Sequence, residues 1–159
     1  MRCSINRFVV LMVVVLAAAT SLQGCAGKLK GSPTVQVSIS ATADGNNCGG
    51  GAASSLKFRV FQVADTGAVR TMLNKGLPWS KHLEAGGANI LVKISEDFVS
   101  PGETKLIPTE RDPRATAIVV EGNFCKKVGA SWYLIHPLAK KGPLQISAGA
   151  TGLTVVPRK

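Results

Sequence analysis

Apolar and polar side chains alternate along several short stretches of the chain from residue 34 onwards, which predicts β-strands with one buried face. The clearest case is residues 34–40, where Val35, Val37 and Ile39 are separated by polar residues. Many short strands bounded by Gly or Pro are typical of a β-sandwich, so we expect a mainly β protein. The other predicted strands cover residues 56–63, 104–107, 115–124, 131–136, 144–148 and 153–156.

The second predicted strand, residues 56–63, needs a cover on its outer face. Phe61 and Val63 lie on the face opposite to its other apolar residues, so the end of this strand must be buried on both sides. A helix over residues 65–75 can supply the cover, because Asp65 can cap it and apolar residues follow at helical spacing. We therefore expect a small helical insertion after the second strand.

The remainder of the insertion is predicted less regularly. A further helical turn is expected around residues 79–83, ended by two glycines, and residues 90–94 are compatible with either a strand or an extended cover. Alternation alone selects the residues that face the space between two sheets. They are Val35, Val37, Ile39, Leu56, Phe58, Val60, Ile118, Val120, Trp132, Leu134, Leu144 and Ile146.

The first 24 residues have the pattern of a secretory signal peptide. Two arginines precede an apolar run at residues 8–19, which is shorter than the roughly 20 residues that a spanning helix needs. Leu22 and Gly24 lie just ahead of Cys25, and this arrangement resembles the lipobox cut by the bacterial lipoprotein signal peptidase. The alternatives are an ordinary signal peptide with a chance cysteine and a retained membrane anchor.

This interpretation of the sequence divides the chain into three parts: a signal peptide at residues 1–24, a lipidated tether at 25–33 and a β-sandwich domain at 34–159. Acyl chains on Cys25 would anchor the protein without a spanning helix. Ala26 stands where proteins retained in the inner membrane usually have Asp. We therefore expect a location on the periplasmic face of the outer membrane.

The charge of the chain narrows the choice of partners. Of the 19 Lys and Arg residues, only Arg2 and Arg7 leave with the signal peptide, so 17 remain against nine Asp and Glu, a net charge of about +8. Nucleic acid is not an expected partner, because a lipidated periplasmic protein meets none and aromatic residues are sparse. An acidic partner or an anionic envelope surface fits better.

Two cysteines, Cys48 and Cys125, remain for the folded domain. In an oxidising compartment we expect a disulfide between them, and two free thiols are the alternative. Cys48 lies in a long loop, residues 41–55, that is rich in turn-forming residues.

No catalytic constellation, metal site or cofactor site is expected. The two histidines, His82 and His136, lack metal-ligand spacing, and we expect His82 at the surface and His136 at a strand end. Glu96 and Asp97 are neighbours on an extended segment, where adjacent side chains point apart. The sequence therefore does not predict an enzyme.

The order of these features resembles TssJ, the outer-membrane lipoprotein family of type VI secretion systems. The resemblance implies a transthyretin-like β-sandwich that holds the periplasmic domain of the inner-membrane protein TssM. The Cys48 and Cys125 pair is not part of the family pattern. The matching features are Cys25, Asn46 and Asn47, the strand at residues 56–63, the Pro-Gly-Glu turn at 101–103, the strand at 115–124 and Trp132.

The resemblance also suggests where the partner binds, because in this family the first loop between strands contacts TssM. Here that loop is residues 41–55, and Asp44, Gly45, Asn46 and Asn47 are its candidate contact residues. A surface loop without a partner is the alternative for the site. A stand-alone periplasmic binding or inhibitor lipoprotein is the alternative for the function, and an envelope hydrolase is the least favoured reading.

Overall fold

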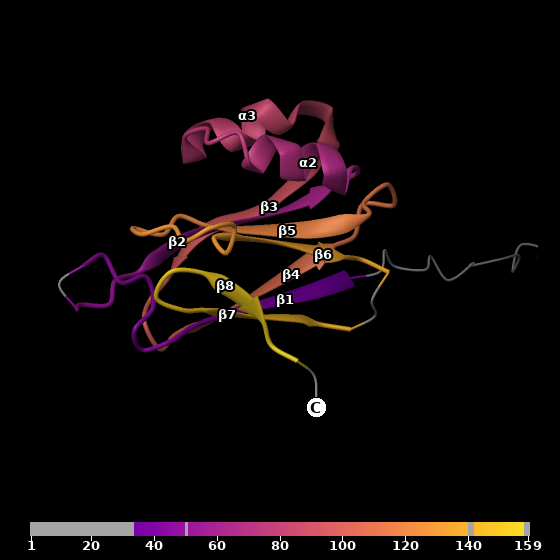
Figure 1. The fold of residues 1–159 in the computed structure, drawn as a ribbon. Coiled ribbons are helices and arrows are strands. Elements are labelled where there is room, and N and C mark those ends of the chain that lie inside the picture. The colour runs from indigo at the N-terminus through magenta and orange to yellow at the C-terminus, as the bar shows by residue number, and fades with distance from the viewer. Residues whose placement is uncertain (1–33, 50, 140–141, 158–159) are drawn as a thin grey trace, which may run out of the picture. The chain divides into compact units, whose positions relative to one another are not determined.

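Two four-stranded β-sheets pack face to face in the computed structural model, and a helical insertion covers the outer face of one of them (Figure 1). The structure describes residues 34–49, 51–139 and 142–157. The predicted signal peptide and tether, including Cys25, lie outside the described residues. The predicted mainly β sandwich, with a small helical insertion after the second strand, is confirmed.

The first sheet has the strand order β4-β1-β7-β8, and the second has the order β3-β2-β5-β6. The strands of the first sheet are β1 (Thr34–Ala41), β4 (Thr104–Glu110), β7 (Leu144–Ala148) and β8 (Leu153–Val155). Those of the second are β2 (Leu56–Val63), β3 (Ile90–Val99), β5 (Ala117–Gly122) and β6 (Tyr133–Pro137).

Strand β1 is central in the first sheet, antiparallel to β4 and parallel to β7. Strand β4 extends to Glu110, three residues beyond the prediction, because it pairs with β1 as far as Thr34. Pro108 is tolerated within it since β4 is an edge strand, where a missing backbone donor costs little.

The helical insertion supplies the cover that Phe61 and Val63 require. Helix α2 (Thr66–Leu73) begins where Asp65 Oδ1 accepts hydrogen bonds from the backbone N–H groups of Gly67, at 2.7 Å, and Ala68, at 3.1 Å. Its buried residues face the sheet, and β2 is buried on both faces from Phe58 onwards. The insertion continues with η2 (Trp79–Lys81), α3 (His82–Gly86) and η3 (Gly87–Asn89).

Residues 90–94, which the sequence leaves open between strand and cover, belong to strand β3. This edge strand pairs with β2 along its whole length, with irregular register at two points.

Most of the predicted core is buried. Ten of the twelve predicted residues are buried, while Val35 and Leu134 are partly buried and pack against that core. Trp132 is buried but not between the sheets: its ring stacks on His82 of the insertion, with the ring centroids 5.4 Å apart. The prediction for Trp132 is wrong because this residue precedes β6, so strand alternation does not decide where its side chain points.

Four loops gather at the end of the sandwich where β1 finishes, and we call this end the loop end (Figure 1). They are residues 42–55, 100–103, 123–132 and 149–152. The chain enters β1 at the opposite end. Among the described residues, no helix combines the length and the apolar character needed to cross a membrane.

Candidate functional site

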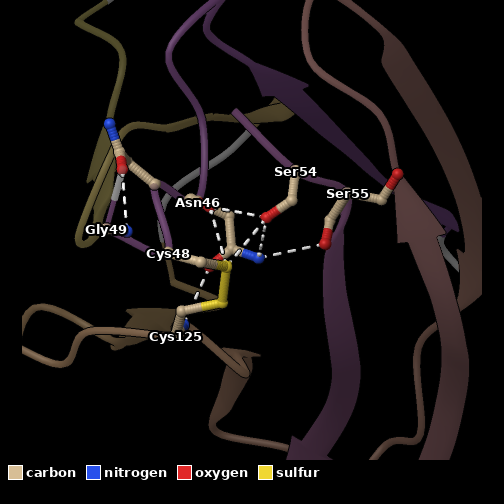
Figure 2. The surroundings of a disulfide bond; sticks show 7 residues. Asn46, Cys48, Gly49, Ser54, Ser55 and Cys125 are labelled. Carbon is tan, nitrogen blue, oxygen red and sulfur yellow. Dashed lines mark hydrogen bonds between the residues drawn. A yellow bond between two sulfur atoms is a disulfide. The ribbon is translucent and has the colours of Figure 1, made fainter. Parts of the chain in front are cut away.

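The long loop at residues 42–55 is covalently joined to the β5–β6 loop at residues 123–132. Cys48 and Cys125, 77 positions apart in sequence, form a disulfide with their Cα atoms 4.9 Å apart (Figure 2). The bond fixes the middle of a glycine-rich segment whose two flanking strands do not pair with each other. The loop is therefore held in place although it contains little regular structure.

Asn46 is the polar centre of this loop. Its Oδ1 accepts a hydrogen bond from the backbone N–H of Cys125 at 2.9 Å, and its Nδ2 donates to the carbonyl of Ser55 at 3.0 Å (Figure 2). Its backbone lies in the left-handed region, with φ of 49°, which asparagine tolerates better than most residues. The side chain is only 4% exposed, so it stabilises the loop and is not available to a partner.

The β7–β8 turn supports the same loop from another side. The backbone N–H groups of Asn46 and Asn47 donate to the carbonyls of Gly149 and Ala150, each at 3.0 Å. Gly45 is buried against this contact, and a Cβ there would lie 3.0 Å from the carbonyl oxygen of Thr42. A side chain at Gly45 would therefore require the Thr42 carbonyl to shift by a few tenths of an ångström.

The four candidate contact residues consequently have different roles. Gly45 and Asn46 are turned inward, whereas Asp44 is exposed and Asn47 is half-buried. The Asp44 carboxylate accepts a hydrogen bond from Thr42 Oγ1 at 2.6 Å, and the exposed carboxylate has further acceptor capacity for a partner. Asp44 and Asn47 are the members of the set that a partner can reach.

A second polar group lies under the helical insertion and centres on Arg59 of β2, which is 4% exposed. Its Nε donates to Glu96 at 3.2 Å, and its Nη1 donates to the carbonyl of Trp79 at 3.2 Å. The guanidinium also lies over the Trp79 ring, 4.4 Å from its centroid, and Nη1 is 3.6 Å from Glu121. Arg59 thus joins strands β3 and β5 to the insertion.

His82 belongs to this buried group, so the prediction of a surface histidine is wrong. It is 1% exposed, with Nε2 2.9 Å from the carbonyl of Leu77 and Nδ1 3.1 Å from Glu121 Oε1. Because a carbonyl only accepts, Nε2 must carry a hydrogen, and Nδ1 is the atom that faces the carboxyl group. The amphipathic pattern of the sequence did not indicate this contact, since its partner lies 39 residues away on β5.

The charges in this group follow from burial and hydrogen bonding. Burial raises the pKa of Glu121 to about 7, and burial also lowers the pKa of His82 below its ordinary value. Below about pH 7 the proton of the pair therefore lies on Glu121, whose O–H donates to the neutral Nδ1 of His82. The hydrogen bond from Lys57, helped by Arg59, lowers the pKa of Glu96 to about 2, so Glu96 is the ionised partner of Arg59.

The contacts of this group tie the insertion to the sheet. Arg59 and His82 each reach Glu121 on β5 and a backbone carbonyl of the insertion segment, that of Trp79 for Arg59 and that of Leu77 for His82. Within residues 34–49, 51–139 and 142–157, no three His, Cys, Asp or Glu side chains are grouped so that they could hold a metal ion.

The buried carboxyl predicts a pH-dependent stability. As pH rises from about 4.5 to about 7, Glu121 ionises in the unfolded chain but keeps its proton in the folded protein, so its contribution to stability falls. Glu121→Gln keeps a donor to His82 and cannot ionise. Relative to wild type, this variant should gain about 2 kcal/mol between pH 5 and pH 7.5.

Urea unfolding at a series of pH values measures this difference. Glu84→Gln is the matched control, because Glu84 is an exposed carboxylate of helix α3. It should show no such gain. A Glu121→Gln variant whose stability runs parallel to wild type across this range would contradict a protonated Glu121.

Known proteins share both the sequence pattern and the fold. A family model described as type VI secretion lipoprotein, VasD, EvfM, TssJ, matches residues 33–154 of the chain. No curated protein matches the chain in sequence.

Three solved structures have a similar fold. Lip of Serratia marcescens, a membrane-bound component of the type VI secretion system, has a TM-score of 0.69 at 18% identity, over 80% of this chain and 99% of that chain. The T6SS lipoprotein TssJ1 of Pseudomonas aeruginosa has a TM-score of 0.67 at 18% identity, over 80% and 98% of the two chains. A chain in the structure described as the T6SS protein TssM C-terminal domain from EAEC has a TM-score of 0.65 at 19% identity, over 79% and 98%. At these identities, the similarity establishes a shared fold.

Proposed function

Because the chain belongs to the family of type VI secretion lipoproteins, we propose that it binds the periplasmic domain of a TssM-like inner-membrane protein and ties the secretion complex to the outer membrane. The family is a membrane-bound structural component of the secretion system and is not a known enzyme family.

The membrane part of the proposal rests on the sequence. Cys25 would carry the lipid after cleavage, and Ala26 favours the outer membrane over retention in the inner membrane. The chain then enters the sandwich at Thr34, at the end opposite to the loop end. Strand β1 has eight residues, so about 26 Å separates its two ends.

The observation that carries the partner-binding part is the fixed loop at residues 42–55. The disulfide and the contacts of Asn46 tie residues 46, 48 and 55 of this loop to their surroundings, which reduces the ordering that binding would otherwise require. Binding residues concentrate on loops that a rigid scaffold positions. A chain of similar fold also occurs in a solved structure whose description names the TssM C-terminal domain. This supports TssM as the choice of partner.

The double variant Asp44→Ala, Asn47→Ala tests the loop while keeping the disulfide and the contacts of Asn46; it removes only the local hydrogen bonds from Thr42 Oγ1 to Asp44 and from the Gly49 N–H to Asn47. Binding of the mature lipoprotein to the periplasmic domain of its cognate TssM, measured by calorimetry in neutral detergent, should weaken at least about tenfold, the size of one or two lost interfacial hydrogen bonds. The melting temperature should stay unchanged, because neither side chain supports the core.

Glu110→Ala is the control, because Glu110 is an exposed carboxylate at the opposite end of the sandwich. It should bind as wild type does. A folded double variant with wild-type affinity would exclude these residues and direct attention to the insertion at residues 65–87.

A further inference from the structure

We propose that the exposed segment at residues 125–130 is a second contact element of the loop end, and that it binds an acidic segment of the protein partner. This inference rests on the proposed function, and it adds the chemistry of the partner surface. The contact residues of this segment are Lys126, Lys127 and Val128. They lie in the β5–β6 loop, beside the loop at residues 42–55.

The first observation is exposure. All six residues from Cys125 to Ala130 are exposed, and Val128 is 51% exposed in the middle of them. Val128 is one of six large apolar residues that the described part of the chain leaves exposed, and it directly follows two lysines. An exposed apolar side chain beside cationic groups is suited to a partner that offers both an apolar and an anionic contact.

The second observation concerns the charges of Lys126 and Lys127. Among the described residues neither lysine forms an ion pair, whereas Lys81, Lys105 and Arg114 are each paired with a carboxylate. Unpaired lysines at the end of a basic domain create a positive potential that attracts acidic groups. Cations that are paired with a carboxylate, such as Lys81, Lys105 and Arg114, create a weaker positive potential.

The third observation is that the segment is held at both ends. Cys125 is tied by the disulfide and by its backbone N–H to Asn46. At the other end Ser131 Oγ donates to the carbonyl of Val128 at 2.7 Å, and Leu153 N–H donates to the carbonyl of Ser131 at 2.7 Å. Lys127 lies over the Trp132 ring, with Nζ 4.3 Å from its centroid. The segment is therefore presented in a fixed conformation next to the candidate loop.

The position of the segment favours a protein over a lipid surface. Strand β6 begins at the loop end, and the chain comes from its predicted lipid anchor into β1 at the other end, about 26 Å away by the length of β1. The segment is instead continuous with the candidate partner-binding loop at residues 42–55, to which the disulfide and the Cys125 N–H join it. We therefore choose an acidic protein segment as the occupant.

Charge reversal at Lys126 tests the inference, since Lys127 also packs on Trp132. The mature lipoprotein in neutral detergent is titrated with the periplasmic domain of its cognate TssM. At about 50 mM salt, Lys126→Glu should weaken binding about tenfold, and the difference should shrink at about 500 mM salt, because screening weakens exposed charge pairs. Val128→Ser should weaken binding a few-fold at both salt concentrations.

Lys75→Glu is the matched control, because Lys75 is exposed and follows helix α2 on the insertion, outside the four loops of the loop end. Like Lys126, it forms no ion pair among the described residues. It carries the same charge change and should alter binding less than about twofold if position decides the effect. An equal loss in both variants would assign the effect to net charge and overturn the second contact element. Lys126→Arg should retain wild-type affinity.

The outcomes separate this inference from the proposed function. Wild-type affinity in Lys126→Glu, together with lost affinity in Asp44→Ala, Asn47→Ala, would overturn the second contact element and leave the proposed function standing. Failure of the wild-type protein to bind the partner domain would remove both. Loss of binding to vesicles containing phosphatidylglycerol, with partner binding unchanged, would assign Lys126 to a lipid surface and overturn the choice of a protein.

Discussion

Replacing Phe58 by alanine is expected to lower the free energy of unfolding by about 3–5 kcal/mol, the range for removing a buried phenylalanine. Phe58 is 0% exposed and lies on β2, the strand between β3 and β5. Its cross-strand partner on β5 is Gly122, which has no side chain to fill a vacated space. The ring of Phe124 already occupies the position that a side chain at Gly122 would take. To fill the cavity left by the substitution, the Phe124 ring would have to leave its own buried position. We therefore expect the cavity to close only in part.

Phe98→Ala is the matched control for this prediction. Phe98 is the next aromatic residue across the same pair of strands, one position from the partner of Phe58 on β3, but it is 53% exposed. Its removal should change stability by no more than about 0.5 kcal/mol. Urea unfolding of both variants at neutral pH measures the difference. A Phe58→Ala protein that melts within a degree of wild type would remove this side chain from the core.

Removing the disulfide is expected to have the other large effect. The double variant Cys48→Ser, Cys125→Ser frees a segment of 77 residues, and the chain-entropy model gives a loss of about 4 kcal/mol for a loop of that length. The two joined loops should also lose more local stability than the rest of the domain, because without the disulfide they meet mainly through Asn46. Amide hydrogen exchange should increase in residues 42–55 and 123–132 before it increases in β2 or β5.

Reduction provides the control for this variant. Wild-type protein treated with a dithiol should lose the same stability and gain the same exchange, whereas the serine variant should not respond to the dithiol. Binding to the partner domain should weaken in both, because the loops then have to be ordered during association. Unchanged exchange in residues 42–55 after reduction would show that hydrogen bonds alone hold the loop.

The sequence by itself determined the elements whose cause is local. Alternation in β1, β2 and β7 predicts their buried faces, because side chains of a strand point alternately to its two sides. Asp65 marks the start of α2, since a capping carboxylate satisfies free backbone N–H groups of the first turn. The apolar positions on the second face of β2 also required the helical insertion that covers them.

The tertiary structure alone decided how the polar residues are used. Asn46 and Asp44 lie two positions apart in a loop without periodicity, yet Asn46 is buried because Cys125 and Ser55 meet its amide, and Asp44 remains exposed. His82 is buried because strand register places Glu121 and Arg59 under α3. A periodic pattern reports which side of its own element a residue occupies. It does not report which distant element covers that side, since that depends on strand order and register across the whole domain.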